Sequence, residues 1–248
     1  MFDAQQYELI DYGGGRKLEQ FGPYRLDRPA PVAAEDRASR PADWSHATAR
    51  FERTGKQSGR WHPPERLPET WNISHGPFRL ELKASEFGHL GVFPEQAGNW
   101  DWIARQVQRW TTARRSAVDP NTGQAPRPRL LNLFAYTGAS TLAAAAAGAE
   151  VTHVDAARNV LTWARRNAEL SGLADAPIRW VHEDVRKFVA REVRRGNRYA
   201  GVILDPPSYG HGAHGEVWQI DQHLPGLLKK CRVLLDEEPL LVLLSAHS

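Results

Sequence analysis

The sequence predicts an α/β fold, a parallel sheet with helices on both faces, preceded by a β-rich N-terminal region. From Arg129 onward, β-type and helical segments alternate, which is the pattern of a parallel sheet. Over residues 1–94, short β-type segments are separated by glycine and proline, which is typical of hairpins. We therefore expect three parts: a β-rich domain at 1–94, a connecting helix and loop at 95–128, and the sheet core at 129–248.

Composition indicates an ordinary globular protein. The chain has 248 residues, of which 41% are hydrophobic and 25% charged. No apolar run approaches the length of a membrane span, and the N-terminus lacks an apolar signal core. Cys231 is the only cysteine, so a cytoplasmic location is expected. The net charge of +3 is compatible with a nucleic-acid partner but does not indicate one.

In the N-terminal region, the predicted strands are Tyr7–Tyr12, Lys17–Phe21, Tyr24–Asp27, Trp71–Ser74 and Phe78–Lys83. The Ala/Pro-rich stretch 29–43 is expected to be an exposed excursion. Arginine and aromatic residues interleave at 50–53 and 60–62, so these rings either stack on bases or form a core. We favour a core for most of them, anchored by Trp44, Trp61 and Trp71, because tryptophan is first a large apolar group.

The connecting segment predicts a helix. Trp100, Ile103, Val107 and Trp110 recur at helical spacing and form one apolar face. Asn99 is a suitable N-cap residue.

The unit around which the rest is organised runs from Arg129 to Asp155. A strand at Leu130–Phe134 is followed by a turn at 135–138, a helix at Ala139–Ala147 and a second strand at Val151–Val154. A turn at a helix N-terminus can hold an anionic or polar ligand group. Asp155 ends the second strand, where the diol of a ribose would reach it. This unit therefore predicts a nucleoside-cofactor site.

The number of glycines in the turn separates two cofactor types. A dinucleotide site normally has three glycines, which let the backbone approach a pyrophosphate. Gly138 is the only glycine in this turn, so a cofactor without phosphates, such as S-adenosylmethionine, fits it better. A strand-helix-strand unit that binds no ligand is the alternative.

The alternation continues beyond Asp155, and the predicted strand order in the sheet is 3-2-1-4-5. The expected elements are helix Arg158–Leu170, strand Ile178–Val181, helix Val185–Arg195, strand Tyr199–Leu204, a Gly/His loop, helix Gln219–Leu235 and strand Leu240–Leu244.

Three acids, Asp155, Asp184 and Asp205, follow successive strands at the edge where parallel sheets bind ligands. One such acid alone is ordinarily solvated or a helix cap. The three together, with the prolines after Asp205, favour a transferase with a nucleoside cofactor. Asp184 is placed to meet an adenine amino group, with Val185 against the ring.

The segment after the fourth strand suits substrate binding. Pro206 and Pro207 make it rigid and poor in donors, which leaves carbonyls to accept hydrogen bonds. Asp205 can accept from an exocyclic amine, and Tyr209 can stack on a flat base.

The segments LLNLFAYTGAS, HVDAARNVLTWARRNAELSG, EDVRKF and ILDPPSYG resemble the Rossmann-like, class I S-adenosylmethionine methyltransferases that modify large-subunit ribosomal RNA. The match is strongest to the cytosine-5 methyltransferase family often called RlmI-like, over roughly residues 88–248. GVFPEQ, at 91–96, resembles its cofactor-covering segment. The resemblance implies S-adenosylmethionine as cofactor and RNA, specifically ribosomal RNA, as partner. It implies these cofactor contacts: Gln96, Phe134, Tyr136, Gly138, Asp155, Asp184, Val185 and Asp205.

The sequence departs from the family in three places. Ala97 replaces the arginine after the Phe-x-x-Gln motif, and the N-terminal region does not match the family's RNA-binding module of the PUA type. Cytosine-5 transfer needs a thiolate, which the family places in a Ser-Cys-Ser-like segment after the fifth strand. That segment is Ser245-Ala246-His247-Ser248 here, and Cys231 is expected to be structural.

We therefore expect direct in-line transfer of the methyl group to a nitrogen or oxygen lone pair, with Asp205, Pro206 and Tyr209 as catalytic residues. His211, His214 and His223 are candidate bases or phosphate contacts, and no metal site is expected.

Two other function classes remain open: a small-molecule or protein methyltransferase, and a non-catalytic RNA-binding protein that keeps the cofactor pocket.

The family continues past the fifth strand with further strands. The run Leu240–Leu244 is apolar and predicted to be a sheet edge, which invites pairing with another chain. We therefore expect this chain to be a piece of a longer one, without the C-terminal strands, and its oligomeric state is left open.

Overall fold

The computed structural model describes residues 2–55, 58–114, 117, 123, 125–212 and 215–246, without the side chain of His211. The chain divides into an N-terminal unit, Met1–Ala97, and a C-terminal unit, Gly98–Ser248. Within the described ranges, none of the helices has both the length and the apolar character needed to cross a lipid bilayer.

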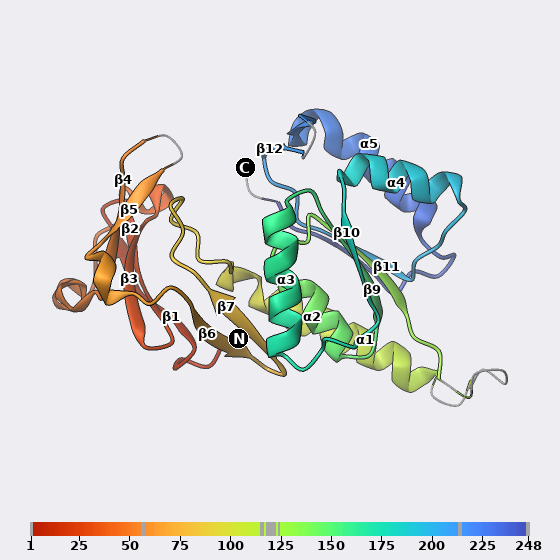
Figure 1. Ribbon diagram of the computed structural model, residues 1–248, viewed down its shortest axis with the longest axis horizontal. Coiled ribbons are helices and arrows are strands. Elements are labelled where there is room, and N and C mark those ends of the chain that lie inside the picture. The colour runs from red at the N-terminus through yellow and green to blue at the C-terminus, as the bar shows by residue number, and fades with distance from the viewer. Residues whose placement is uncertain are drawn as a thin grey trace. The chain divides into compact units, whose positions relative to one another are not determined.

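The N-terminal unit is β-rich, as predicted, and is coloured red to yellow in Figure 1. One sheet has the order β1-β2-β3-β4-β5, and β6 and β7 form a separate hairpin. The strands are β1 (Tyr7–Gly13), β2 (Arg16–Phe21), β3 (Tyr24–Pro29), β4 (Ala49–Arg53), β5 (Gly59–His62), β6 (Trp71–His75) and β7 (Phe78–Leu82). Short 3-10 helices are η1 (Pro31–Ala33), η2 (Pro41–His46), η3 (Pro64–Arg66) and η4 (Pro94–Gln96).

The five strands predicted here are confirmed, and two were missed. β4 and β5 carry the interleaved arginines and aromatics, whose alternation is that of half-buried strands. Phe51, Trp61 and Trp71 are buried, so the core interpretation is correct for them. Trp44 is only half-buried, and its Nε1 donates to Asp11 Oδ2 at 2.8 Å.

The C-terminal unit contains a parallel sheet of order β10-β9-β8-β11-β14, which confirms the predicted 3-2-1-4-5 order. Its strands are β8 (Arg129–Leu133), β9 (Glu150–Asp155), β10 (Ile178–His182), β11 (Gly201–Leu204) and β14 (Leu241–Leu244). Its helices are α1 (Ala97–Ala113), α2 (Ala139–Ala146), α3 (Arg158–Leu170), α4 (Val185–Arg194) and α5 (Ile220–Leu234).

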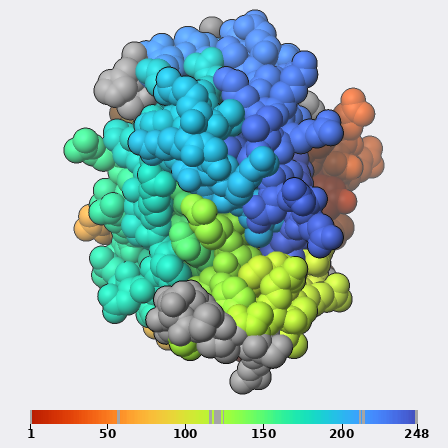
Figure 2. Space-filling view, turned by 90° about the vertical axis from the view of Figure 1, so that its right-hand side faces the viewer, coloured from red at the N-terminus to blue at the C-terminus, as the bar shows by residue number. Residues whose placement is uncertain are grey.

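Alternate residues of each strand build two cores. Leu131 and Leu133 pack with α4 and α5 on one face, whereas Leu130 packs with α1 and α2 on the other. Figure 2 shows α4 in cyan and α5 in blue beside each other on the surface of the first face. Both faces are thus covered by helices, as a buried parallel sheet requires.

Two further features concern the end of the chain. The segment predicted as a Gly/His loop contains two short strands, β12 (Tyr209–His211) and β13 (Val217–Gln219), which pair as an antiparallel hairpin. The sequence interpretation missed it because its strands are short and interrupted by glycine. β14 lies at the end of the strand order within the described sheet, and Val242 and Leu244 on it are exposed.

Candidate cofactor-binding site

The turn between β8 and α2 has an unusual backbone. Phe134 and Tyr136 have positive φ angles of 56° and 49°, and Gly138, which caps α2, has φ of 92°. For residues other than glycine this conformation costs on the order of 1–3 kcal/mol each and tends to occur at functional sites. The surrounding structure must therefore hold this turn in place.

Asp155, the last residue of β9, holds the turn directly. Its Oδ2 accepts from the Tyr136 N–H at 2.9 Å, and its Oδ1 accepts from the Ala157 N–H at 2.9 Å. Burial raises the pKa of the Asp155 carboxyl, against the lowering effect of these N–H donors. Each oxygen can accept a second hydrogen bond, so the carboxylate can hold the turn and still accept from a ribose diol.

A buried polar chain supports the turn from beneath. Asn132 Nδ2 on β8 donates to Thr141 Oγ1 on α2 at 2.9 Å, and Thr141 Oγ1 lies 2.9 Å from His153 Nδ1 on β9. Burial lowers the pKa of His153 to about 3, so its ring is neutral at physiological pH. In addition, Asn167 Nδ2 on α3 donates to the Thr137 carbonyl within the turn at 2.9 Å. This network of hydrogen bonds connects β8, α2, β9 and α3 around the turn. The sequence analysis did not predict it, because its only signal there is a polar residue within each of two otherwise apolar strands.

The residues at the turn fit S-adenosylmethionine. No side chain caps the N-terminus of α2, so its first N–H groups remain available to a carboxylate. A Cβ at Gly138 would lie 3.3 Å from Ala164 Cβ, so this glycine serves the turn and the packing of α3, not the approach of a phosphate. Asp155 keeps the capacity to accept further hydrogen bonds beside the turn.

Asp184 and Val185 open α4 after β10. Asp184 Oδ1 accepts from the Lys187 N–H at 3.0 Å and so caps the helix. The structure shows this capping bond directly, while an adenine amino group would use the other oxygen. Val185 is buried within the core.

Asp205, Pro206 and Tyr209 follow β11, whose neighbour β8 leads into the turn. The Asp205 N–H donates to the Leu133 carbonyl at 3.4 Å, and Asp205 Oδ1 accepts from Ser245 Oγ at 2.7 Å. The Pro206 carbonyl accepts no hydrogen bond from the described residues, whereas the Pro207 carbonyl accepts from Trp218 Nε1 at 2.7 Å. Of the two proline carbonyls that were expected to be left to accept hydrogen bonds from a substrate, only that of Pro206 has no partner among the described residues.

The β12–β13 hairpin links this segment to the turn. The rings of Trp218 and Phe134 lie 4.7 Å apart between centroids, so β13 packs against the left-handed turn. Tyr209 on β12 is 51% exposed, which leaves its ring accessible to a ligand. Trp218 was not singled out from the sequence, because nothing there shows that β13 returns to the site.

Four further residues complete the comparison with the sequence expectations. Gln96 belongs to η4 in the N-terminal unit. His223 Nδ1 accepts from the Gln219 N–H at 2.9 Å and so binds the start of α5. His214 and the side chain of His211 lie outside the described part of the chain. Among the residues that are described, no group of three or more His, Cys, Asp or Glu side chains could hold a metal ion.

Two positions bear on the question of a thiol nucleophile: the segment 245–248 and Cys231. Ala246 is exposed, and His247 and Ser248 lie outside the described residues. Cys231 lies on α5 with its side chain buried in the core, and burial raises the pKa of its thiol to about 12. A thiol in that environment is neutral and inert at physiological pH.

Comparison with known proteins gives the family. The model of the S-adenosylmethionine-dependent methyltransferase family matches residues 43–238. A solved S-adenosylmethionine-dependent methyltransferase from Agrobacterium tumefaciens is 44% identical, with a TM-score of 0.87, over 98% of this chain and 73% of that one. The methyltransferase structure SMU.776, solved with S-adenosylhomocysteine, shares the fold at 20% identity, with a TM-score of 0.76, over 98% of this chain and 62% of that one.

Curated relatives match this chain over shorter stretches than the solved structures do. The ribosomal RNA large subunit methyltransferase K/L of Hahella chejuensis is 39% identical over 43% of this chain and 15% of its own length. The ribosomal RNA large subunit methyltransferase I of Aeromonas hydrophila is 40% identical over 33% of this chain and 21% of its own length. The matched part is thus less than a quarter of either relative. By its family model and its relative in Agrobacterium, this chain belongs to the S-adenosylmethionine-dependent methyltransferase family, and S-adenosylmethionine is its cofactor.

Proposed function

We propose that this protein methylates a base of large-subunit ribosomal RNA, on a nitrogen or oxygen atom, by direct in-line transfer. The observation that carries the proposal is the pair of acceptors after β11. The Asp205 carboxylate and the Pro206 carbonyl, which accepts no hydrogen bond from the described residues, belong to consecutive residues, and the half-exposed Tyr209 follows three positions later. An exocyclic amine of a base offers two hydrogens to such acceptors, and its ring can stack on tyrosine.

Bound S-adenosylmethionine supplies an electrophilic methyl group on a sulfonium. The chain's residues then need to hold the base so that its lone pair points at that methyl group, and to accept the proton that an amine loses on transfer. Asp205 is placed for both tasks, since Ser245 Oγ fixes its orientation at 2.7 Å. The rigid Pro206-Pro207 segment keeps the acceptor carbonyl in position.

The absence of a suitable thiol favours this route over cytosine-5 transfer. Ala246 stands where the resembling family has its cysteine, and the Cys231 thiol is buried with a raised pKa. The names of the curated relatives support ribosomal RNA as the substrate class, although they match only part of this chain.

For the contacts to the cofactor, we propose Asp155 at the ribose diol, Asp184 and Val185 at the adenine, and the turn of Phe134, Tyr136 and Gly138 along its length. For Gln96, a covering contact to the cofactor is proposed from the resemblance of GVFPEQ alone.

Transfer of a tritiated methyl group to purified, unmodified large-subunit ribosomal RNA tests the proposal. Digestion to nucleosides and mass spectrometry then identify the methylated atom. We expect an N- or O-methylated nucleoside. Formation of 5-methylcytidine would refute direct transfer, and labelling of proteins or metabolites in place of RNA would favour the alternative methyltransferase class.

A further inference from the structure

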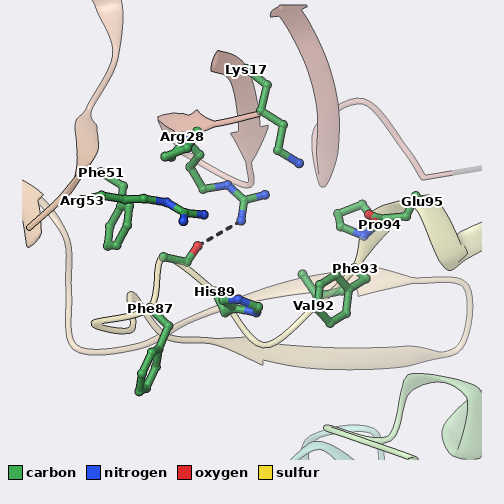
Figure 3. A pocket seen from close by; sticks show the side chains of 12 residues that line it. Lys17, Arg28, Phe51, Arg53, Phe87, His89, Val92, Phe93, Pro94 and Glu95 are labelled. Carbon is green, nitrogen blue, oxygen red and sulfur yellow. Dashed lines mark hydrogen bonds between the residues drawn. The ribbon is translucent and has the colours of Figure 1, made fainter. Parts of the chain in front are cut away.

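The N-terminal unit contains a cavity that is lined in part by residues 92–95 of the GVFPEQ segment. Its volume is about 170 Å³, whereas one water needs roughly 10–15 Å³. Lys17, Arg28 and Arg53 line it from β2, β3 and β4, and Phe87, His89 and Phe93 line it from the segment that follows β7 (Figure 3). A basic wall therefore faces an aromatic one.

The cavity holds three basic side chains against two carboxylates, those of the buried Glu19 and of Glu95, which also lines it, so positive charge is in excess. Lys17 Nζ and Arg28 Nη2 both pair with the buried Glu19 carboxylate, at 3.1 and 2.6 Å. Arg53 forms no ion pair within the described residues, and its guanidinium lies toward that of Arg28 in Figure 3. Because Arg28 already pairs with Glu19 and Arg53 has no ion-pair partner among the described residues, the Arg53 guanidinium can bind an added anion.

The local electrostatics agree with this excess. His89 keeps solvent exposure, yet partial desolvation by its neighbours lowers its pKa, and the charges of Arg28 and Arg53 lower it further. A cationic side chain is therefore disfavoured at this point of the cavity, as expected where positive charge already gathers.

The aromatic wall is held by a closely packed loop. The Trp61 Nε1 donates to the Ser85 carbonyl at 3.0 Å, and the Ser85 N–H donates to the His89 carbonyl at 3.1 Å. Gly88 has φ of +78°, and a Cβ there would lie 2.9 Å from the Phe51 ring. Arg28 Nη1 donates to the Gly88 carbonyl at 3.2 Å, the dashed line in Figure 3, so the loop is tied to the basic wall.

This rigid loop exposes a large apolar side chain. Phe87 at its tip is 62% exposed. An exposed aromatic ring at the rim of a cavity that also contains Arg53 provides for the two parts of a nucleotide, a flat base and a phosphate.

We propose that this cavity binds single-stranded RNA, with a backbone phosphate against Arg53 and a base stacked on Phe87. The inference rests on the proposed function, because it takes RNA as the substrate, and it identifies an RNA-binding site in a unit whose sequence lacks the family's usual module. A free phosphate would use the basic wall alone, so a contribution from Phe87 distinguishes RNA from a simple anion.

The test is fluorescence anisotropy with a labelled single-stranded RNA of about ten nucleotides, within the usual site sizes. Arg53→Ala and Phe87→Ala are each expected to weaken binding about tenfold, since stacked bases and phosphate contacts have effects of this order. Arg53→Ala also lowers the slope of log affinity against log salt by about 0.7. Arg66→Ala and Tyr12→Ala are the controls, because both residues are exposed in the same unit but do not line the cavity; they are expected to bind like the wild type.

Titration with S-adenosylhomocysteine and the tritiated methyl-transfer assay are run on the same variants. Wild-type RNA affinity in both cavity variants would overturn the inference, as would a loss confined to S-adenosylhomocysteine affinity, since the cavity would then serve the cofactor. Loss with Arg53→Ala but not Phe87→Ala would reduce the site to a phosphate site and overturn the stacking. If RNA is methylated but the cavity variants bind RNA like the wild type, this site is refuted and the proposed function is not. If the cavity variants bind RNA more weakly but no methyl group is transferred to RNA, this site is supported and the proposed function is refuted.

Discussion

The Asp155 carboxylate accepts a hydrogen bond at 2.9 Å from the N–H of Tyr136, a residue whose φ angle is 49°. One side chain at the end of β9 thus holds a costly backbone conformation in the neighbouring turn. Its oxygens retain lone pairs that can accept from the ribose in the proposed contact. Holding the turn and binding the cofactor are therefore coupled through a single carboxylate, and substitution there should affect both.

Replacement of Asp155 by alanine should weaken binding of S-adenosylhomocysteine at least tenfold and lower the stability of the fold by about 1–3 kcal/mol. The physical reason is that the Tyr136 and Ala157 N–H groups lose their acceptor in a partly buried site. Isothermal titration and thermal unfolding measure the two effects.

Glu150→Ala is the matched control at the other end of the same strand. Glu150 makes only an exposed ion pair with Arg129 at 3.6 Å, which is worth little. Unchanged cofactor affinity in Asp155→Ala would remove Asp155 from the proposed site.

Cofactor affinity should fall on acidification at a higher pH than an ordinary aspartate predicts. Burial raises the pKa of Asp155 in the folded protein above the usual value of about 3.9, and only the ionised form accepts two hydrogen bonds per oxygen. Because the folded state binds this proton more tightly than the unfolded state, protonation of Asp155 by itself favours folding. Binding should therefore be lost before the protein unfolds. Titrations from about pH 7 down to pH 4 check this, and a flat profile in Asp155→Asn is the expected control result.

Thr141→Val should destabilise the protein by about 1–3 kcal/mol and weaken cofactor binding. The substitution keeps the shape but leaves the buried Asn132 Nδ2 and His153 Nδ1 without their shared partner. Thr162→Val is the control, because its hydroxyl bonds only the Arg158 carbonyl of its own helix at an exposed position; a change within about 0.5 kcal/mol is expected there. Equal melting temperatures for the two variants would show that the buried chain does not support the turn.

The parallel sheet could be predicted because β-type and helical segments alternate from Arg129 onward, and such alternation is typical of parallel sheets. The helix α1 followed from the helical spacing of its apolar residues. β4, β5 and the β12–β13 hairpin were missed because short strands with charged or glycine positions carry a weak signal. The site acids could be placed at strand ends, but not their partners. The bonds of Asp155 to Tyr136 and of Asp205 to Ser245 join residues far apart in sequence, and only tertiary packing sets them.

Cys231→Ala should retain methyl transfer and lose about 1 kcal/mol of stability from a small core cavity. The thiol is 4% exposed, and its pKa is raised to about 12 by burial, so almost no thiolate exists at neutral pH. Iodoacetamide should accordingly label the native protein slowly at pH 8 and label it readily once it is denatured. Abolished transfer in a well-folded Cys231→Ala protein would instead identify the thiol as a nucleophile.

Asp205→Asn should lower kcat for methyl transfer more than it lowers affinity for S-adenosylhomocysteine. The amide keeps one acceptor oxygen for the Ser245 hydroxyl, which now binds Asp205 Oδ1 at 2.7 Å, but it cannot take up the proton that an amine loses. Loss of a positioned general base typically costs 10²–10⁴-fold in rate, so a fall of about a hundredfold is expected. Ser245→Ala removes only the orienting hydroxyl, and we expect a smaller fall of about tenfold that Ser245→Thr restores in part. Single-turnover transfer to ribosomal RNA separates chemistry from binding. If Asp205→Asn loses cofactor affinity and keeps its single-turnover rate, Asp205 is a cofactor ligand only, and the proton must leave by another route.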